Sequence, residues 1–184
     1  YNGYANVKLP HKFKIAVGGC PNNCVKPSLN DLGIIGQLVP NFDEEFCSGC
    51  KKCLVEEICP IDAARVVDGV LNIDKDLCNN CGRCIGKCHF DAIKDGEIRY
   101  KITIGGRWGK RANDGIPINK LFKNKDEVIN IIEKMILIYR EQGITGERLA
   151  DTIKRIGFQN IEAQLLSDDI LERKQEILDS KLLI

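Results

Sequence analysis

The chain has 184 residues, 43% of them hydrophobic and 29% charged, and its formal net charge at pH 7 is +1. A chain of this length and composition can bury a globular core of one or two domains. The near-neutral charge gives no support for a nucleic-acid partner. No segment approaches the length of a membrane span, and the first residues do not resemble a signal peptide. We therefore expect a globular protein without a membrane span.

Two segments near the start of the chain have the pattern of β-strands. Residues 12–17 alternate apolar side chains with charged or small ones, which is typical of a half-buried strand. Residues 32–39 form an apolar run that ends at Pro40, and its glycines indicate a close approach of another group. Cys20 and Cys24 lie between these two predicted strands.

Eight further cysteines lie in the middle of the chain, in two runs that each consist of a C-x2-C-x2-C triple and a fourth cysteine. The runs are Cys47, Cys50, Cys53 and Cys59, and Cys78, Cys81, Cys84 and Cys88. One such triple binds three irons of a [4Fe–4S] cluster, and in two-cluster ferredoxins the fourth cysteine of each run ligates the other cluster. The spacing therefore predicts two clusters, one held by Cys47, Cys50, Cys53 and Cys88 and the other by Cys78, Cys81, Cys84 and Cys59.

Zinc and disulfide bonds are the alternatives for these cysteines. Structural zinc sites use four ligands, often as two C-x2-C pairs, whereas two triple runs suit cubic clusters better. Disulfides require an oxidising compartment and are typical of shorter chains. Two details depart from the usual ferredoxin spacing: five residues separate Cys53 from Cys59, and His89 replaces the proline that usually follows the fourth cysteine. We expect the extra residues to lengthen the approach to Cys59 without removing this ligand. For His89 we expect a surface or loop role, and tuning of a cluster potential is the alternative.

The cysteine-rich segment contains an internal repeat. Each fourth cysteine is followed by a similar short sequence and then by an Asp-Gly pair, Asp68-Gly69 or Asp95-Gly96, between apolar residues. Asp-Gly in this setting predicts a β-hairpin, so we expect two pseudo-symmetric halves, each with a cysteine loop, a short helix and a strand. Residues 41–97 contain 12 acidic and 7 basic side chains. These acids either steer a basic redox partner or form an ordinary solvated surface.

A third predicted strand, residues 98–104, leads into a glycine-rich segment, residues 105–111. The segment carries Arg107, Lys110 and Arg111. Backbone N–H groups and cations arranged in this way can bind carboxylates or phosphates, although one glycine-rich loop is weak evidence by itself.

The rest of the chain has helical periodicity. Asn124 is a predicted N-cap, with Glu127 three residues later, and the helix is expected to end at Gly143. Thr145 is the predicted cap of a second helix that ends at Gly157, and a final helix is expected from about residue 168. We interpret these helices as packing elements.

The sequence around these segments resembles the sulfite and nitrite reductase family. Residues 9–36, with Gly-Gly-Cys-Pro-Asn-Asn-Cys, resemble the sirohaem–[4Fe–4S] segment. Residues 100–158, with Gly-Gly-Arg-Trp-Gly-Lys-Arg and Gly-Glu-Arg-Leu-Ala-Asp-Thr-Ile, resemble the rest of that family's C-terminal half. The cysteine-rich segment is similar to the ferredoxin insert of dissimilatory and anaerobic sulfite reductase subunits. The resemblance implies an α+β fold, in which a ferredoxin-like 2[4Fe–4S] domain (41–97) is inserted into a mixed α/β reductase half-domain (1–40 and 98–184).

The resemblance also implies a third metal centre. Cys20 and Cys24 would be the second cysteine pair of the sirohaem-linked cluster, with Cys24 bridging to the sirohaem iron. Asn22 and Asn23 would lie against the macrocycle. Basic residues would pair with the eight carboxylates of sirohaem; they are Lys12, Lys14, Arg107, Lys110 and Arg111.

Part of the family pattern has no counterpart in these residues. No C-x5-C pair precedes Cys20, and the basic residues that bind the anion in this family lie in its N-terminal half. We therefore expect this sequence to be the C-terminal part of a longer protein, and the isolated chain to be inactive. Sirohaem and the third cluster would then be present in the intact protein only.

The function implied is six-electron reduction of sulfite to sulfide, with the two ferredoxin clusters relaying single electrons from an external donor or partner reductase subunits. Nitrite reduction to ammonia requires the same number of electrons and stays open as the alternative substrate. Reduced thiols and [4Fe–4S] clusters favour a cytoplasmic location. A stand-alone two-cluster electron carrier without a catalytic centre is the alternative function.

Overall fold

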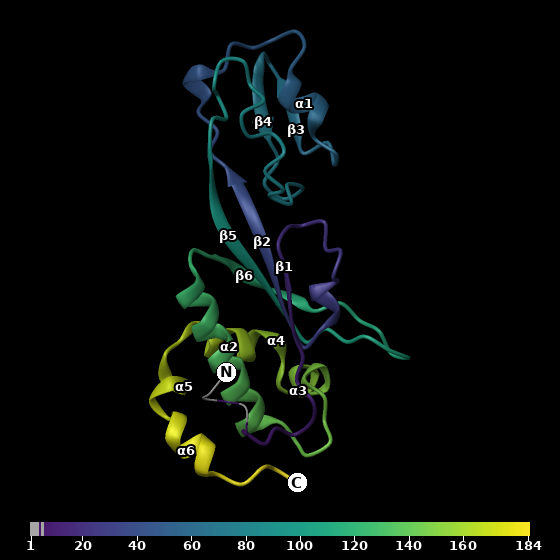
Figure 1. The fold of residues 1–184 in the computed structure, drawn as a ribbon, viewed down its shortest axis with the longest axis vertical. Helices are drawn as coiled ribbons and strands as arrows, with labels where there is room; N and C mark the ends of the chain where they lie inside the picture. The colour runs from purple at the N-terminus through teal and green to yellow at the C-terminus, as the bar shows by residue number, and fades with distance from the viewer. Residues whose placement is uncertain (1–3, 5) are drawn as a thin grey trace. The chain divides into compact units, whose positions relative to one another are not determined.

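The computed structural model describes Tyr4 and residues 6–184 (Figure 1). Two compact units are present. The frame unit contains the chain up to Gly18, Asn23–Ile35 and Tyr100–Ile184. The cysteine-rich unit contains Gly19–Asn22 and Gly36–Arg99. In the described part of the chain, no helix is both long enough and apolar enough to cross a membrane.

A four-stranded sheet has the order β1-β2-β5-β6. Strand β1 (Ile15–Gly18) is parallel to β2 (Leu32–Pro40), with Ile15 opposite Leu32. Strand β5 (Gly96–Ile104) is antiparallel to β6 (Ile116–Phe122). The boundary between the units falls inside β2 and inside β5. The three predicted strands are therefore present, β6 is an additional one, and the mixed α+β class is confirmed.

Helix α2 (Lys125–Gln142) is the main helix of the frame unit. Asn124 caps it as predicted, because its side-chain oxygen accepts a hydrogen bond from the backbone N–H of Glu127 at 2.9 Å. Gly143 follows the last turn. The helix contacts all four later helices, α3 (Leu149–Ile156), α4 (Phe158–Leu166), α5 (Asp169–Glu172) and α6 (Lys174–Asp179).

The later helices differ from expectation at two places. Helix α3 (Leu149–Ile156) has Arg148 at its N-cap, and Thr145 instead donates its hydroxyl hydrogen to the backbone oxygen of Leu183 at 2.7 Å. Gly157 ends α3 with a positive φ of 95°, and α4 follows at once. The expected final helix is divided into α5 and α6, because the chain leaves the helical path at Arg173.

The frame unit has a continuous core of large aliphatic and aromatic side chains. Strands β2, β5 and β6 and helices α2–α6 all contribute to this core. Fully buried members include Leu32, Ile102, Phe122, Leu137 and Tyr139. This unit therefore has the apolar core that an independently stable domain requires.

The cysteine-rich unit contains two short helices, η2 (Glu44–Phe46) and α1 (Leu54–Ile58), and a hairpin of β3 (Ala64–Val67) and β4 (Val70–Ile73). Asp68 and Gly69 form the predicted turn, and both have positive φ angles, 50° and 81°. The second half differs from the first. Residues 78–95, all of them described, form turns and loops without a helix, and Gly96 begins β5 instead of closing a hairpin. The expected two-fold pseudo-symmetry is therefore wrong for the second half.

Candidate metal centre

Four cysteines from different parts of the cysteine-rich unit surround one small cavity: Cys59, Cys78, Cys81 and Cys84. Its other walls are mainly apolar and include Ile61, Ala63 and Ile73. Burial is the largest cause that raises the pKa of the Cys84 thiol to about 11, and the charges of Cys78, Cys81 and Cys59 raise it further. These four residues are the ones predicted to hold one cluster, including Cys59 from the other run.

The backbone of the second cysteine loop is shaped to fit against β2. Asn80 and Gly82 have positive φ angles, 55° and 71°. Leu38 donates its backbone N–H to the carbonyl of Asn80 at 2.9 Å. A Cβ at position 82 would lie 2.7 Å from the Leu38 side chain, so only glycine fits this turn. The turn orients the loop that carries Cys78, Cys81 and Cys84.

The other predicted cluster has less preformed geometry. The cysteine-rich unit has a small core of buried residues, Val55, Ala64, Leu71 and Ile93. Cys47, Cys53 and Cys88 pack against this small core, whereas Cys50 is half-buried and does not. The backbone N–H of Leu71 donates to the Cys47 sulfur at 3.4 Å. In the described residues, no three cysteine, histidine or carboxylate side chains are arranged to hold a single metal ion, and all ten cysteines are free.

The five residues between Cys53 and Cys59 have a defined structure. They form α1, with Cys53 at its N-cap and Cys59 at its C-cap. Val55, at the centre of the helix, is fully buried in the small core. The lengthened spacing is therefore one helical turn that carries the chain from one predicted cluster to the other. His89 is exposed in a turn, as expected.

The predicted sirohaem-side residues are mostly exposed. Cys20, Cys24 and Asn22 are exposed, and Cys20 and Cys24 belong to different units. Asn23 has a positive φ of 57°, and its amide nitrogen donates to the Ser28 hydroxyl at 3.2 Å. Its amide oxygen is buried without a hydrogen-bond partner in the described chain. Such an oxygen requires a donor from outside these residues.

The glycine-rich segment forms a hairpin-like loop in the frame unit. Arg107 and Asn113 exchange backbone hydrogen bonds at 2.9 and 3.0 Å. Gly106 packs directly on the 28–30 segment, where a Cβ would lie 2.0 Å from the carbonyl oxygen of Ser28. The loop therefore lies close to the segment that follows Cys24.

A buried ion pair fixes the base of this loop. The Asp31 carboxylate is 2.8 Å from the Arg148 guanidinium, and both side chains are largely buried. The same carboxylate accepts a hydrogen bond from the backbone N–H of Lys14 at 3.0 Å. The backbone oxygen of Asp31 accepts from the N–H of Gly105 at 2.8 Å. Asp31 thus connects β1, α3 and the start of the glycine-rich loop.

A groove of about 560 Å³ lies between this loop and α3. Two of the predicted basic residues, Arg107 and Arg111, line it together with Lys154, which the sequence analysis did not select. Two acids, Asp114 and Asp151, also line this groove, which is called the basic groove below, and Arg107 is 3.4 Å from Asp151. Lys110, Lys12 and Lys14 are exposed and do not line this groove. Lys154 lies on α3, two residues before its end, and helical periodicity alone places it on the solvent side.

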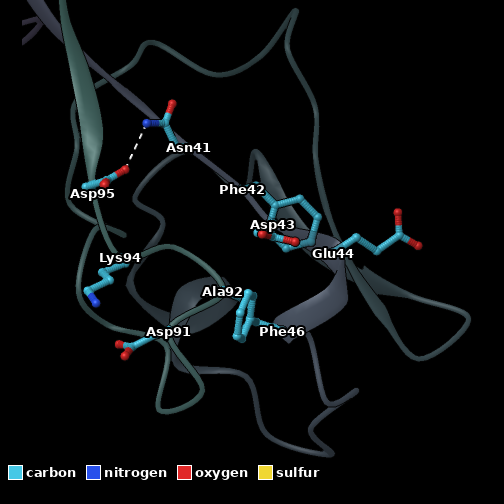
Figure 2. A pocket seen from close by; sticks show the side chains of 9 residues that line it. All are labelled: Asn41, Phe42, Asp43, Glu44, Phe46, Asp91, Ala92, Lys94 and Asp95. Carbon is cyan, nitrogen blue, oxygen red and sulfur yellow. Dashed lines mark hydrogen bonds between the residues drawn. The ribbon is translucent and has the colours of Figure 1, made fainter.

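A second groove, of about 500 Å³, lies in the cysteine-rich unit and has the opposite charge (Figure 2). The segments just before Cys47 and just after Cys88 form it, with Phe46 beside Ala92. Its acidic side chains are Asp43, Glu44, Asp91 and Asp95, against one base, Lys94. Asn41 donates to the Asp95 carboxylate at 2.8 Å.

Comparison with known proteins gives consistent results. The nitrite and sulphite reductase 4Fe-4S domain model matches residues 1–173. The chain is 39% identical, over 153 residues, to the coenzyme F420-dependent sulfite reductase of Methanocaldococcus jannaschii, covering 81% of this chain and 24% of that protein. It is 44% identical over 45 residues to one subunit of the anaerobic sulfite reductase of Salmonella typhimurium, a match that spans 24% of this chain and 13% of that protein.

The solved structure of dissimilatory sulfite reductase I matches with a TM-score of 0.59 and 27% identity, over 85% of this chain and 43% of that one. The chain thus spans about a quarter of the first relative and less than half of the solved one. Since the family model matches nearly every residue, this chain belongs to the nitrite and sulphite reductase 4Fe-4S domain family.

Proposed function

We propose that this chain is the part of a sulfite reductase that relays single electrons through two [4Fe–4S] clusters toward a sirohaem centre, for the six-electron reduction of sulfite to sulfide. The observation that supports the relay best is the cavity enclosed by Cys59, Cys78, Cys81 and Cys84. Four thiols around one mainly apolar cavity are the donor set and surroundings that a [4Fe–4S] cluster requires.

The residues present suit both clusters. Cys78, Cys81, Cys84 and Cys59 would hold one, and Cys47, Cys50, Cys53 and Cys88 the other. When bound, the clusters would supply one-electron transfer, with potentials set by hydrogen bonds and solvent exposure. The backbone N–H of Leu71 donates to the Cys47 sulfur, and mainly apolar residues surround Cys84.

The sirohaem and a third cluster would require residues of the longer reductase, because Cys20 and Cys24 supply only two thiols. Asn23, whose amide oxygen is buried and unpaired in the described chain, would lie near that centre, with Asn22 beside it. Arg107 and Arg111 would bind carboxylates from the basic groove, and Lys154 belongs with them. Lys12, Lys14 and Lys110 would act from the exposed surface.

Sulfite is the proposed substrate because two relatives and the solved structure bear the name sulfite reductase. A more distant relative, 21% identical, is named nitrite reductase, so nitrite is the competing anion. We propose that the electron donor is an external protein or a partner reductase subunit, and that the protein is cytoplasmic.

The test is the iron and acid-labile sulfide content of anaerobically purified protein, together with its visible spectrum. About eight irons and eight sulfides per chain, with broad absorption and no haem bands, are expected for the chain as given. Zinc in place of iron, or a colourless protein after anaerobic reconstitution, would contradict the relay. About four irons would leave one cluster and disprove a two-cluster relay.

A further inference from the structure

Asn79 lies between two predicted cluster ligands, Cys78 and Cys81, and is one of the residues that line the cavity that they share with Cys59 and Cys84. Its amide oxygen is completely buried, and it has no hydrogen-bond partner in the described chain. The cavity provides few polar groups that could pair with this amide, since Arg83 is the only charged side chain among the residues that line it.

A buried amide end without a partner is unfavourable, because it has lost its hydrogen bonds to water. The other end of the same amide, Nδ2, makes no hydrogen bond in the described chain and is not enclosed in this way. Rotation of the amide by 180° exchanges its oxygen and nitrogen without changing its shape. The N–H group would then take the buried position, and the oxygen would take the other position, where water can donate to it.

The groups that would fill this cavity are acceptors. Thiolate and sulfide sulfurs of a [4Fe–4S] cluster accept hydrogen bonds, and such bonds are one means by which a protein sets the reduction potential. A cluster thus gives the N–H orientation of Asn79 a partner and gives the oxygen orientation none.

We propose that the Asn79 side chain donates an N–H hydrogen bond to the cluster held by Cys59, Cys78, Cys81 and Cys84, and so raises the reduction potential of that cluster. This inference rests on the iron–sulfur content proposed above. A donor near the sulfurs stabilises the extra negative charge of the reduced cluster. Asn79 would therefore affect the charge distribution of the cluster through a hydrogen bond, without being one of its iron ligands.

The other cysteine run has no such donor at the matching position. The residue between Cys47 and Cys50 that corresponds to Asn79 is Ser48, and Ser48 is exposed. The residue after Asn79, Asn80, is already occupied, because its amide nitrogen donates to Gln37 at 3.1 Å. The cluster held by Cys59, Cys78, Cys81 and Cys84 would therefore have a side-chain donor that the other lacks, whereas the other has the backbone N–H of Leu71 at Cys47.

The test compares Asn79→Leu with Asn72→Leu in anaerobically purified protein that contains both clusters. Asn72 is exposed on β4 and lies outside the cavity, so it controls for the loss of an asparagine. Potentiometric titration followed by electron paramagnetic resonance should show that Asn79→Leu lowers one of the two potentials and leaves the other unchanged. Asn72→Leu should leave both unchanged. An unchanged or raised potential in Asn79→Leu would overturn the proposal.

A second measurement separates the hydrogen bond from the effect of an apolar replacement, and it needs no variant. Wild-type protein with nitrogen-15 in the asparagine side chains should show a nitrogen hyperfine coupling to one reduced cluster in pulsed electron paramagnetic resonance. Absence of that coupling would disprove the contact even if Asn79→Leu failed to load iron. Protein that binds no iron would contradict the proposed function itself, whereas normal clusters without the coupling or the shift would contradict this inference alone.

Discussion

The two units of this chain bury their interiors in different ways. In the frame unit, large side chains from β2, β5, β6 and five helices form one apolar core. In the described part of the cysteine-rich unit, the buried core cluster consists of Val55, Ala64, Leu71 and Ile93, and cysteines pack around it. The first core follows from the hydrophobic effect. The second is much smaller, so we expect it to offset less of the entropy of ordering its loops.

This difference indicates where the iron contributes to stability. In small metal-binding domains, the free energy of metal binding is largely folding free energy. The cysteine-rich unit has the features of such a domain: short elements, many loops and thiols at the edge of its core. We therefore expect the clusters to complete its core, and the frame unit to be stable without them.

The largest expected effect is that of iron removal. Anaerobic chelation should unfold the cysteine-rich unit and leave the frame unit folded, because their cores are separate. Hydrogen exchange would be measured before and after chelation. Amide protection in β3 and β4 should be lost almost completely, while α2 keeps its protection. Equal loss in both units would show that they fold as one, and no loss would show that the small core suffices alone.

The next effect concerns the frame unit. Leu137→Ala, at a fully buried position of α2, should lower the free energy of unfolding of this unit by about 2–5 kcal/mol. Chemical denaturation monitored by helical circular dichroism measures the change. Ile129→Ala, at a position on the same helix that is 53% exposed, is the control and should cost less than about 0.5 kcal/mol. The cluster absorption of Leu137→Ala should stay unchanged in native buffer, and its loss would refute the separation of the two cores.

A pH-sensitive ion pair between Glu147 and Arg155 provides a further test of the frame unit alone. Hydrogen bonding by Arg155 is the main cause that lowers the pKa of Glu147 from 4.5 to about 2, and this carboxylate also accepts bonds from Ile144 and Thr152. Because the folded-state pKa is the lower one, the stabilisation is complete above pH 4.5 and is lost as the pH falls toward 2. We expect a loss of about 1–2 kcal/mol over that range, reduced by the partial exposure of Arg155.

Glu147→Gln should remove this pH dependence from the frame unit. The measurement is the difference in free energy of unfolding between wild type and Glu147→Gln at several pH values below 5. That difference should shrink as the pH falls. A difference that stays constant with pH would show that the ion pair does not stabilise the fold.

The smallest expected effect concerns the negative charges of the acidic groove in the cysteine-rich unit. Asp43→Asn combined with Glu44→Gln, in the acidic groove (Figure 2), should slow reduction of the clusters by a cationic viologen radical about two- to five-fold at low salt. Reduction by the dithionite anion should not be slowed. Asp126→Asn, an exposed change in the frame unit, is the control. Equal rates with viologen, at low and high salt, would show that the acidic side chains are only a solvated surface.

Local sequence patterns predicted the parts of the fold that depend on local chemistry. Asn124 and Gly143 predicted the ends of α2 because capping involves neighbouring residues. Asp68-Gly69 predicted its hairpin because both residues tolerate a positive φ. The prediction of a hairpin from the same pair at 95–96 was wrong. Asn41 competes for Asp95 by donating hydrogen bonds to its backbone oxygen and to its carboxylate, and Gly96 is the first residue of β5. That competition comes from a segment more than fifty residues away.

The same limit applies to the site. The spacing of the cysteines predicted which four would be grouped, and the structure brings Cys59 to Cys78, Cys81 and Cys84. Strand β6 was missed because Pro117 and two pairs of exposed residues obscure its alternation. Lys154 was missed because its place in the basic groove depends on how α3 packs against the loop after β5. The role of Asn79 depends on burial, which a sequence does not display.

Helix α1 has a consequence for recognising proteins of this kind. One helical turn between Cys53 and Cys59 replaces the usual three-residue link, and it is held in place by the buried side chain of Val55. A search pattern that demands three residues at this point would pass over the chain, although all eight cysteines are present. Family members with such a helical spacer would be missed by that pattern in the same way.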